Sequence, residues 1–432
     1  MRSHLIFRFS LPIFVISLMS TGSYAQKIIP IDTSKKVTIR VDPANTMGGN
    51  VSEIFASVDY IPLETTSEST FGRIEQLEVT DDRFIILDEN TNCILIFKKD
   101  GKFVAKIKGG DKKYPGGHSF HYSVKISDFK LNRFTSEIMF SSFNMDTRIT
   151  TWHFYDIDGK KLRDIVRGTK DPEFDEGMFI GKDLIVSASG LNDSKSEGVE
   201  TRYLLEYIKN LKEIPYRSMP YQVKGLEVYG DLYSVASGPL FHFGVDTALF
   251  FIKSNDYSIF KVTPNKVEHS FQFVFPLINA LPADFVSNAA YKGKRFQYLK
   301  DHKDAIYGIG NCFLVGDNLT FKVTNSNLVT EKQSSMIYNL KSGTIIGLGH
   351  ITTDELSYFL PVADHKMLNY TGFVASDGEY VYSSFPSMTM FNAHEENKGK
   401  NISYNKVLAD YFSNGKNVDN PVIVQIKLKN QL

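Results

Sequence analysis

The chain has 432 residues, of which 42% are hydrophobic and 23% charged, and this apolar share excludes a disordered or collagen-like protein. Its 49 Lys and Arg residues balance 49 Asp and Glu residues, so no basic surplus is available to hold phosphates and we expect no nucleic-acid partner. Phenylalanine and tyrosine are frequent, with 33 and 22 residues against a single tryptophan, which favours strands over helices.

The first 25 residues have the pattern of a secretory signal peptide. Basic residues precede an apolar stretch at residues 9–19, which is shorter than the roughly 20 residues that cross a bilayer. The small residues Ser23 and Ala25 predict cleavage before Gln26, and the alternative is a buried N-terminal helix. Because no cysteine lies near this point and no second long apolar run follows, we expect an exported protein, periplasmic or secreted, with neither a lipid anchor nor a transmembrane segment.

Residues 74–107 predict four short strands in succession. Residues 84–87 and 93–97 are apolar runs, and residues 103–107 place alternate apolar side chains on one face. The turn before this last strand contains Gly101, which tolerates the positive φ of a tight hairpin. Four strands joined in order by short turns are typical of one blade of a β-propeller.

Further units of the same kind follow along the chain. They lie at residues 124–166, 178–214, 229–273 and 304–349, and a last unit combines residues 376–382 with residues 421–428. We therefore predict an all-β fold, a six-bladed β-propeller with four-stranded antiparallel blades and a few short helical insertions. The insertions are expected at residues 277–301 and 404–415, over one face of the disc, where repeat proteins often carry their binding surface.

A ring of blades must also close, since free first and last strands would leave backbone groups unpaired. Residues 58–63 are a candidate closing strand that would pair near residues 421–428. This arrangement divides the chain into a signal peptide at residues 1–25, an N-terminal extension at residues 26–57 and a propeller at residues 58–432.

Residues 58–66, with the sequence VDYIPLETT, resemble the opening of a six-bladed, NHL-like β-propeller family that is abundant in exported proteins of gut Bacteroidetes. Residues 71–74, 82–88, 96–103 and 419–422 are similar to that family as well. The family usually carries a GxGPGEY loop after the first blade, of which residues 108–117 retain only Pro115-Gly116. The resemblance implies the propeller fold and an exported location, and it implies no settled activity.

The two cysteines, Cys93 and Cys312, lie in apolar, strand-like runs. Two cysteines in a chain of this length do not form a disulfide scaffold, so we predict two buried free thiols. The alternative is a bridge, which would require their Cα atoms to lie within about 7 Å.

Four residues are candidates for a ligand-binding surface. His118 and His121 follow a Pro-Gly-Gly segment in which a turn could direct both rings to one ligand, and the alternative is a pair of solvated loop histidines. Tyr114, in the same glycine-rich segment, is the best candidate for an exposed aromatic ring. Trp152 could form a platform for a sugar ring, or it could fill the core between two blades.

No catalytic motif stands out, since the chain contains neither G-x-S-x-G nor a complete G-x-G-x-x-G. We therefore expect a monomeric binding or scaffold module without a cofactor, which engages a glycan, peptide or protein at the loop face or in the central funnel. The alternative is a propeller enzyme, a metal-assisted hydrolase, lactonase or lyase, whose site at the central channel could use calcium or zinc. Candidates for the channel mouth are Asp128, Glu176, His242 and His302. A structural subunit of an envelope complex is a third interpretation.

Overall fold

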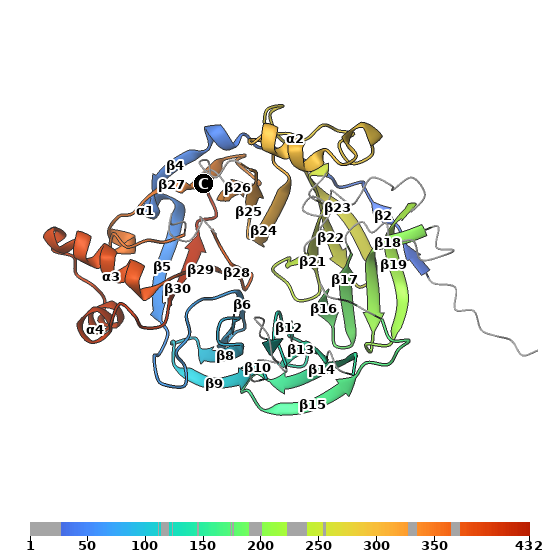
Figure 1. Ribbon diagram of the computed structural model, residues 1–432. Coiled ribbons are helices and arrows are strands. Elements are labelled where there is room, and N and C mark those ends of the chain that lie inside the picture. Colours follow the sequence, from blue (N-terminus) through green and yellow to red (C-terminus); the bar gives the residue numbers. More distant parts are fainter. Residues whose placement is uncertain are drawn as a thin grey trace, which may run out of the picture.

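Six sheets surround a central axis, so the predicted six-bladed β-propeller is confirmed (Figure 1). The computed structural model describes residues 27–110, 112–113, 121–122, 124–144, 147–172, 174, 177–189, 201–222, 240–253, 256–326, 335–363 and 372–432. Within each blade the strands pair antiparallel in chain order, from the axis outwards. Among the described residues, no helix is both long enough and apolar enough to span a bilayer.

The first three blades follow the chain directly. Blade 1 holds β6 (Gln76–Val79), β7 (Arg83–Asp88), β8 (Cys93–Lys98) and β9 (Phe103–Lys108). Blade 2 holds β12 (Lys130–Asn132), β13 (Glu137–Asn144), β14 (Ile149–Asp156) and β15 (Lys161–Val166), after a hairpin of β10 (Lys112–Lys113) and β11 (His121–Tyr122). Blade 3 holds β16 (Gly177–Gly181), β17 (Leu184–Ala188), β18 (Thr201–Lys209) and β19 (Glu213–Gln222).

The last three blades complete the ring. Blade 4 holds β20 (Leu240–His242), β21 (Leu249–Lys253), β22 (Ser258–Thr263) and β23 (Lys266–Val274). Blade 5 holds β24 (Gly308–Val315), β25 (Asn318–Thr324), β26 (Ser335–Asn339) and β27 (Ile345–Thr352). Blade 6 holds β28 (Ala375–Ser376), β29 (Val381–Phe385), β30 (Val422–Leu428) and, from the start of the chain, β5 (Phe55–Pro62).

The apolar runs of the sequence are strands that pack against a neighbouring blade on both faces. In β7, Phe84 and Ile86 belong to a core shared with blade 6, whereas Ile85 and Leu87 belong to a core shared with blade 2. All four side chains are at most 1% exposed. A strand that is buried on both sides needs no polar alternation, which is why its sequence is continuous in hydrophobicity.

An N-terminal belt, residues 27–50, lies along the outer edges of three successive blades. Its strand β1 (Lys27–Ile29) pairs parallel with β19, β2 (Ile31–Asp32) and β3 (Val37–Arg40) pair parallel with β23, and β4 (Met47–Asn50) pairs parallel with β27. Figure 1 shows β2 and β4, coloured blue, outside blades 4 and 5. The belt thus covers the edges of blades 3, 4 and 5, and sequence analysis assigned it no structure because its strands have only two to four residues.

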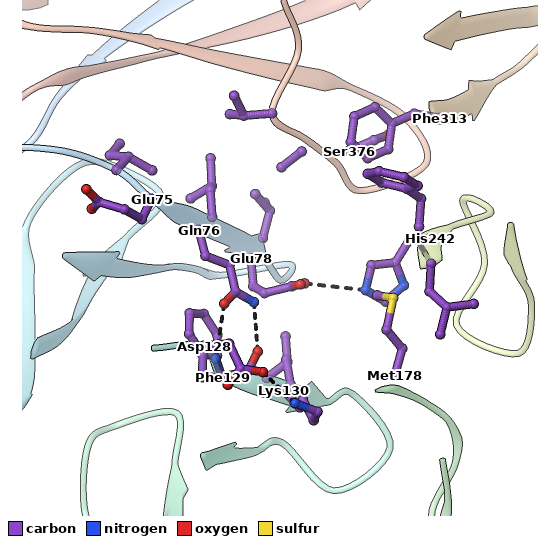
Figure 2. Close-up of a pocket in the computed structure, with 18 of the residues that line it drawn as sticks. Glu75, Gln76, Glu78, Asp128, Phe129, Lys130, Met178, His242, Phe313 and Ser376 are labelled. Atoms are coloured by element: carbon purple, nitrogen blue, oxygen red, sulfur yellow. Dashed lines mark hydrogen bonds and ion pairs between the residues drawn. The ribbon is translucent and has the colours of Figure 1, made fainter. Parts of the chain in front are cut away.

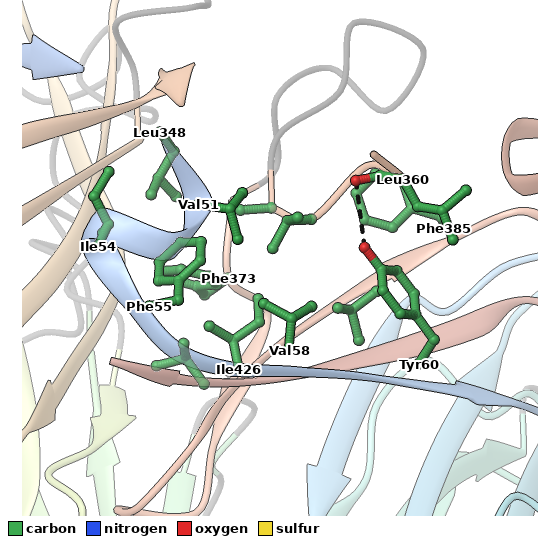
Figure 3. Close-up of a cluster of buried hydrophobic side chains, with 14 of the residues drawn as sticks. Val51, Ile54, Phe55, Val58, Tyr60, Leu348, Leu360, Phe373, Phe385 and Ile426 are labelled. Atoms are coloured by element: carbon green, nitrogen blue, oxygen red, sulfur yellow. Dashed lines mark hydrogen bonds between the residues drawn. The ribbon is translucent and has the colours of Figure 1, made fainter. Parts of the chain in front are cut away.

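The ring closes where β5 pairs antiparallel with β30. Val422 lies opposite Pro62, and Val424 lies opposite Tyr60, at the position where the sequence pattern indicated a closing strand. The short helix α1 (Val51–Ile54) precedes β5 and packs into the core of blade 6 (Figure 3). The hydroxyl of Tyr60 donates to the carbonyl of Leu360 at 3.3 Å, which anchors the closing strand to the core.

The helices lie at the perimeter of the ring, so the expectation that the insertions cover one face of the disc is wrong (Figure 1). In the part of the chain that the structure describes, the helices besides α1 are η1 (Pro43–Asn45), η4 (Ala289–Tyr291), α2 (Arg295–Asp301), η6 (Glu355–Ser357), α3 (Ser387–Glu396), η8 (Lys398–Lys400) and α4 (Lys406–Asn414). The predicted helix near residue 404 is α4, which begins after Asn405 and ends at the cap residue Gly415. Its apolar side chains, Leu408 and Tyr411, pack against blade 6 and hold the helix at the outer wall.

Candidate functional site

A cavity of about 360 Å³ lies on the axis of the ring, where the inner strands meet. Every blade contributes to its wall, from residues 74–79, 128–131, 177–178, 240–242, 313 and 374–376. Because side chains alternate along a strand, Gln76 and Glu78 of β6 share one face, and Figure 2 shows Glu75 pointing away from His242. We call the end of the cavity at which the inner strands begin the entry end, and the other the exit end.

The Gln76 side chain joins blade 1 to blade 2. Its Nε2 donates to the carbonyl of Phe129 at 2.7 Å, and its Oε1 accepts from the backbone N–H of Phe129 at 3.1 Å (Figure 2). Both ends of the amide are therefore occupied, and the side chain is held in one orientation.

Near the entry end, Asp128 presents a carboxylate to the cavity. Its Oδ2 accepts from the ammonium of Lys130 at 2.5 Å. The Lys130 side chain is only 9% exposed, whereas that of Asp128 is 45% exposed. The carboxylate of Asp128 is therefore the accessible group of this ion pair, and the ammonium of Lys130 is largely buried.

At the exit end, Glu78 lies between two positively charged or protonatable groups. Its Oε2 lies 3.0 Å from Nη2 of Arg133 and 3.4 Å from Nε2 of His242 (Figure 2). Burial by itself would raise the pKa of Glu78, but His242 and Arg133 outweigh it and lower this pKa to about 2. Glu78 is therefore ionised at physiological pH, and its carboxylate can only accept hydrogen bonds.

The turn between β20 and β21, residues 243–248, crosses the ring at the exit end. From blade 4, its Asp246 lies 3.7 Å from Nε of Arg133 in blade 2. Its Gly244 approaches the backbone of Gly378 in blade 6 so closely that a Cβ on Gly378 would overlap the Gly244 carbonyl oxygen. This turn and the Glu78 ion pairs therefore narrow the exit end of the cavity.

The wall formed by blades 3 to 6 is mostly apolar. Phe241 and Phe313 meet edge to face, with ring centroids 6.1 Å apart. Met178 and His242 both line the cavity, and Figure 2 shows their side chains overlapping in this view. A ligand in the cavity would therefore meet polar groups on one side and aromatic rings on the other.

Of the four predicted channel-mouth residues, the structure brings Asp128 and His242 together around the cavity. The prediction for His302 is wrong, because it follows α2 at the perimeter, where its ring stacks on Tyr298 with centroids 3.9 Å apart. Glu176 lies outside the described residues.

The predicted binding residues are not part of this cavity as far as the structure describes them. Tyr114 and His118 lie outside the described residues, and so does the side chain of His121, whose backbone belongs to β11. Trp152 is 3% exposed and stacks on Phe174 in the core between blades 2 and 3, so it offers no platform to a sugar.

Both cysteines are buried and free, as predicted. Burial raises the pKa of the Cys93 thiol and of the Cys312 thiol, so neither is a reactive thiolate at neutral pH. Within the described parts of the chain, no three His, Cys, Asp or Glu side chains are grouped closely enough to hold a metal ion.

Sequence analysis missed four polar residues of the site, Gln76, Glu78, Lys130 and Arg133. The sequence did contain a signal for Gln76 and Glu78. They are two residues apart on the first strand of a blade, where side chains point alternately to the channel and to the core. Arg133 carried no signal, since it follows β12 in a turn and reaches Glu78 only through the curvature of the ring.

Comparison with the solved structure of one exported Bacteroides protein supports the fold. The structure of BF0058 from Bacteroides fragilis, described as a candidate exported protein, matches with a TM-score of 0.61 at 14% identity and covers 91% of this chain and 100% of that chain. A member of the DUF4221 family from Bacteroides vulgatus matches with a TM-score of 0.40 at 10% identity, covering 87% of this chain and 97% of that chain. A Bacteroides thetaiotaomicron protein of unknown function matches with a TM-score of 0.38 at 10% identity, covering 89% and 75%.

No curated protein matches the chain. The resemblance to exported six-bladed propellers of Bacteroidetes is confirmed by a family match that extends over residues 36–427, from the belt to the last strand. The chain belongs to the DUF4934 family, which is described as a domain of unknown function.

Proposed function

We propose that this protein is an exported binding module whose central cavity takes a small organic ligand, or the end of a glycan or peptide. The observation that carries the proposal is the cavity itself, because about 360 Å³ falls within the range of roughly 300–1,000 Å³ that is typical of ligand sites. Its wall combines a few polar groups with aromatic rings, which is the usual composition of such sites.

The polar wall is preorganised for binding. Gln76 is held by the backbone of Phe129, and Glu78 is held by Arg133. Because these side chains already have one orientation, a ligand would not need to order them, and less affinity is lost to conformational entropy.

The ligand can be located with a cavity-filling variant. Met178→Trp places a large ring in the cavity, whereas Met388→Trp changes an exposed methionine of α3 at the perimeter and serves as the control. Thermal shifts of the wild type and both variants are measured with oligosaccharides, short peptides and small organic molecules. We expect a ligand that stabilises the wild type and Met388→Trp, by about 2.7 kcal/mol at 100 times its Kd, and that has no effect on Met178→Trp. A shift that persists in Met178→Trp would place the binding site elsewhere.

An acid–base enzyme is the second candidate function, and the pair of Glu78 and His242 favours it. A carboxylate 3.4 Å from a ring nitrogen orients an imidazole, and an oriented imidazole beside a cavity can accept or donate a proton. His242→Asn keeps a polar side chain without a proton-transferring ring. Product formation that the wild type shows and His242→Asn lacks, while both bind the ligand, would establish the enzyme rather than the binding module.

The location and the assembly state are proposals as well. Cleavage before Gln26 would free the chain directly before β1, so the belt would begin at the mature N-terminus. N-terminal sequencing of the mature protein and light scattering of the purified chain test export by cleavage and the monomeric state.

A further inference from the structure

We propose that the cavity selects an alkylammonium group and rejects carboxylates and phosphates. This inference rests on the proposed binding function and names the chemistry of the ligand. The inference depends on which donors and acceptors of the cavity wall remain free once the hydrogen bonds and ion pairs within the protein are counted.

In the described part of the chain, two cations lie near the cavity, Arg133 and Lys130, and each is paired with a carboxylate of the protein. The Arg133 guanidinium donates to Glu78 and, through Nη1, to the carbonyl of Val79 at 2.6 Å, and it is not part of the cavity wall. The Lys130 side chain, 9% exposed, donates to Asp128. Among the described residues that line the cavity, an anionic ligand would therefore meet no exposed positive charge.

The acceptors, by contrast, are presented to the cavity. In the described part of the chain, the Oδ1 atom of Asp128 and the Oε1 atom of Glu78 have no hydrogen-bond donor, because each carboxylate uses its other oxygen. Asp246 adds a further negative charge beside Arg133. The cavity thus offers acceptors without matching donors, and this pattern suits a ligand that donates hydrogen bonds.

In its neutral form, the imidazole of His242 adds a third acceptor. The ionised carboxylate of Glu78 can only accept, so a neutral His242 carries its proton on Nε2 and directs it to Glu78 at 3.4 Å. The opposite ring nitrogen, Nδ1, is then an acceptor as well. An ammonium group supplies three donors and a positive charge, whereas a carboxylate supplies neither.

The apolar wall fits the carbon chain of such a ligand. Phe241 and Phe313 offer ring faces and edges, and Met178 offers a flexible thioether. An alkyl chain can pack on these side chains while its ammonium group reaches the acceptors opposite, so the expected ligand is amphipathic.

The test uses ligands of one shape and different charge: butylamine, butanol and butyrate. Nα-acetyl-lysine amide and Nα-acetyl-norleucine amide distinguish a free amine from a lysine side chain of a peptide. Calorimetry and thermal shift are measured on the wild type, on Asp128→Asn and on the control Asp301→Asn, which removes a charge at the perimeter. We expect butylamine to bind more tightly than butanol, and butyrate not to bind. The Asp128→Asn substitution should weaken the affinity for butylamine about tenfold, which corresponds to about 1.4 kcal/mol.

Binding of butyrate equal to that of butylamine, unchanged affinity in Asp128→Asn, or no binding of either amine would overturn the proposal. The binding function itself is judged separately. If none of these amines binds but a glycan or peptide stabilises the wild type and not Met178→Trp, the binding module stands and only the ammonium selectivity is refuted.

Discussion

Glu78 illustrates how partners from different blades determine the state of a single carboxyl group. Arg133 comes from the turn that follows the inner strand of blade 2, and His242 comes from the inner strand of blade 4. Burial opposes ionisation, and these two groups reverse that effect and bring the pKa of Glu78 to about 2. The charge of Glu78 therefore depends on the ring being closed.

This pKa makes the stability contribution of Glu78 depend on pH. A carboxyl group with a lowered pKa stabilises the folded state above its ordinary pKa of 4.5, and that contribution is lost as pH falls towards about 2. At about 1.4 kcal/mol per pKa unit, the unfolding free energy of the wild type should exceed that of Glu78→Gln by about 3 kcal/mol at pH 6. Urea unfolding at pH 6, 4, 3 and 2 should show this difference vanishing at the acidic end, with the exposed Glu396→Gln as control. A difference that is constant across these pH values would contradict the assignment.

The contribution of the belt to the stability of the fold depends on a few buried side chains. On β3, Ile39 is 0% exposed, whereas Val37, two residues earlier, is 47% exposed. The belt is also fixed by polar contacts, since Lys266 lies 2.8 Å from Asp32 and holds the pKa of that carboxyl well below its usual range. Both contacts lie on β23, the outer strand of blade 4, and the pairings of β1 with β19 and of β4 with β27 extend the belt to blades 3 and 5.

Two substitutions on β3 measure how much the belt stabilises the ring. Ile39→Ala removes a fully buried side chain beside Phe273 and should lower the unfolding free energy by about 2–4 kcal/mol. Val37→Ala, on the same strand, should change it by less than about 1 kcal/mol, because this side chain is half exposed. Denaturant unfolding of both variants provides the comparison. Equal effects would mean that β3 adds no buried packing to blade 4.

At the scale of the whole molecule, the ring is held together at its seam and across its axis. At the seam, Nδ2 of Asn420 donates to the carbonyls of Glu64 and Ser69, and its Oδ1 accepts from the backbone N–H of Phe71. Asn420 is 1% exposed, and it joins the last blade to the segment that leads into the first. Across the axis, the turn at residues 243–248 connects blade 4 to blades 2 and 6.

The contact of this turn with blade 6 requires glycine at position 378. Gly378 has a φ of +91°, and a Cβ there would overlap the carbonyl oxygen of Gly244. Gly378→Ala should therefore lower the unfolding free energy by about 2 kcal/mol. It should also weaken ligand binding, because the turn that narrows the cavity would shift. Gly399→Ala is the control, since nothing lies within 4 Å of its Cβ position, and it should change stability by less than about 0.5 kcal/mol. The prediction fails if both variants unfold at the same denaturant concentration.

Local sequence patterns specify the repeated unit of this protein. Local patterns were sufficient for the strands of the first blade, the turn at Gly101, the closing strand near Tyr60 and the helix before Gly415, because each depends on neighbours a few residues apart. The burial of both cysteines followed from the same local hydrophobicity.

Which of these strands and side chains contact one another depends on the tertiary structure. The belt strands of two to four residues have too little pattern to be recognised, and they are strands only because blades 3, 4 and 5 offer unpaired edges. Glu78, Arg133 and His242 form one site because six twisted sheets close around an axis and bring three distant segments within hydrogen-bonding or ion-pairing distance. Local sequence determines which residues form strands, but the closure of the ring determines which side chains face one another across the axis.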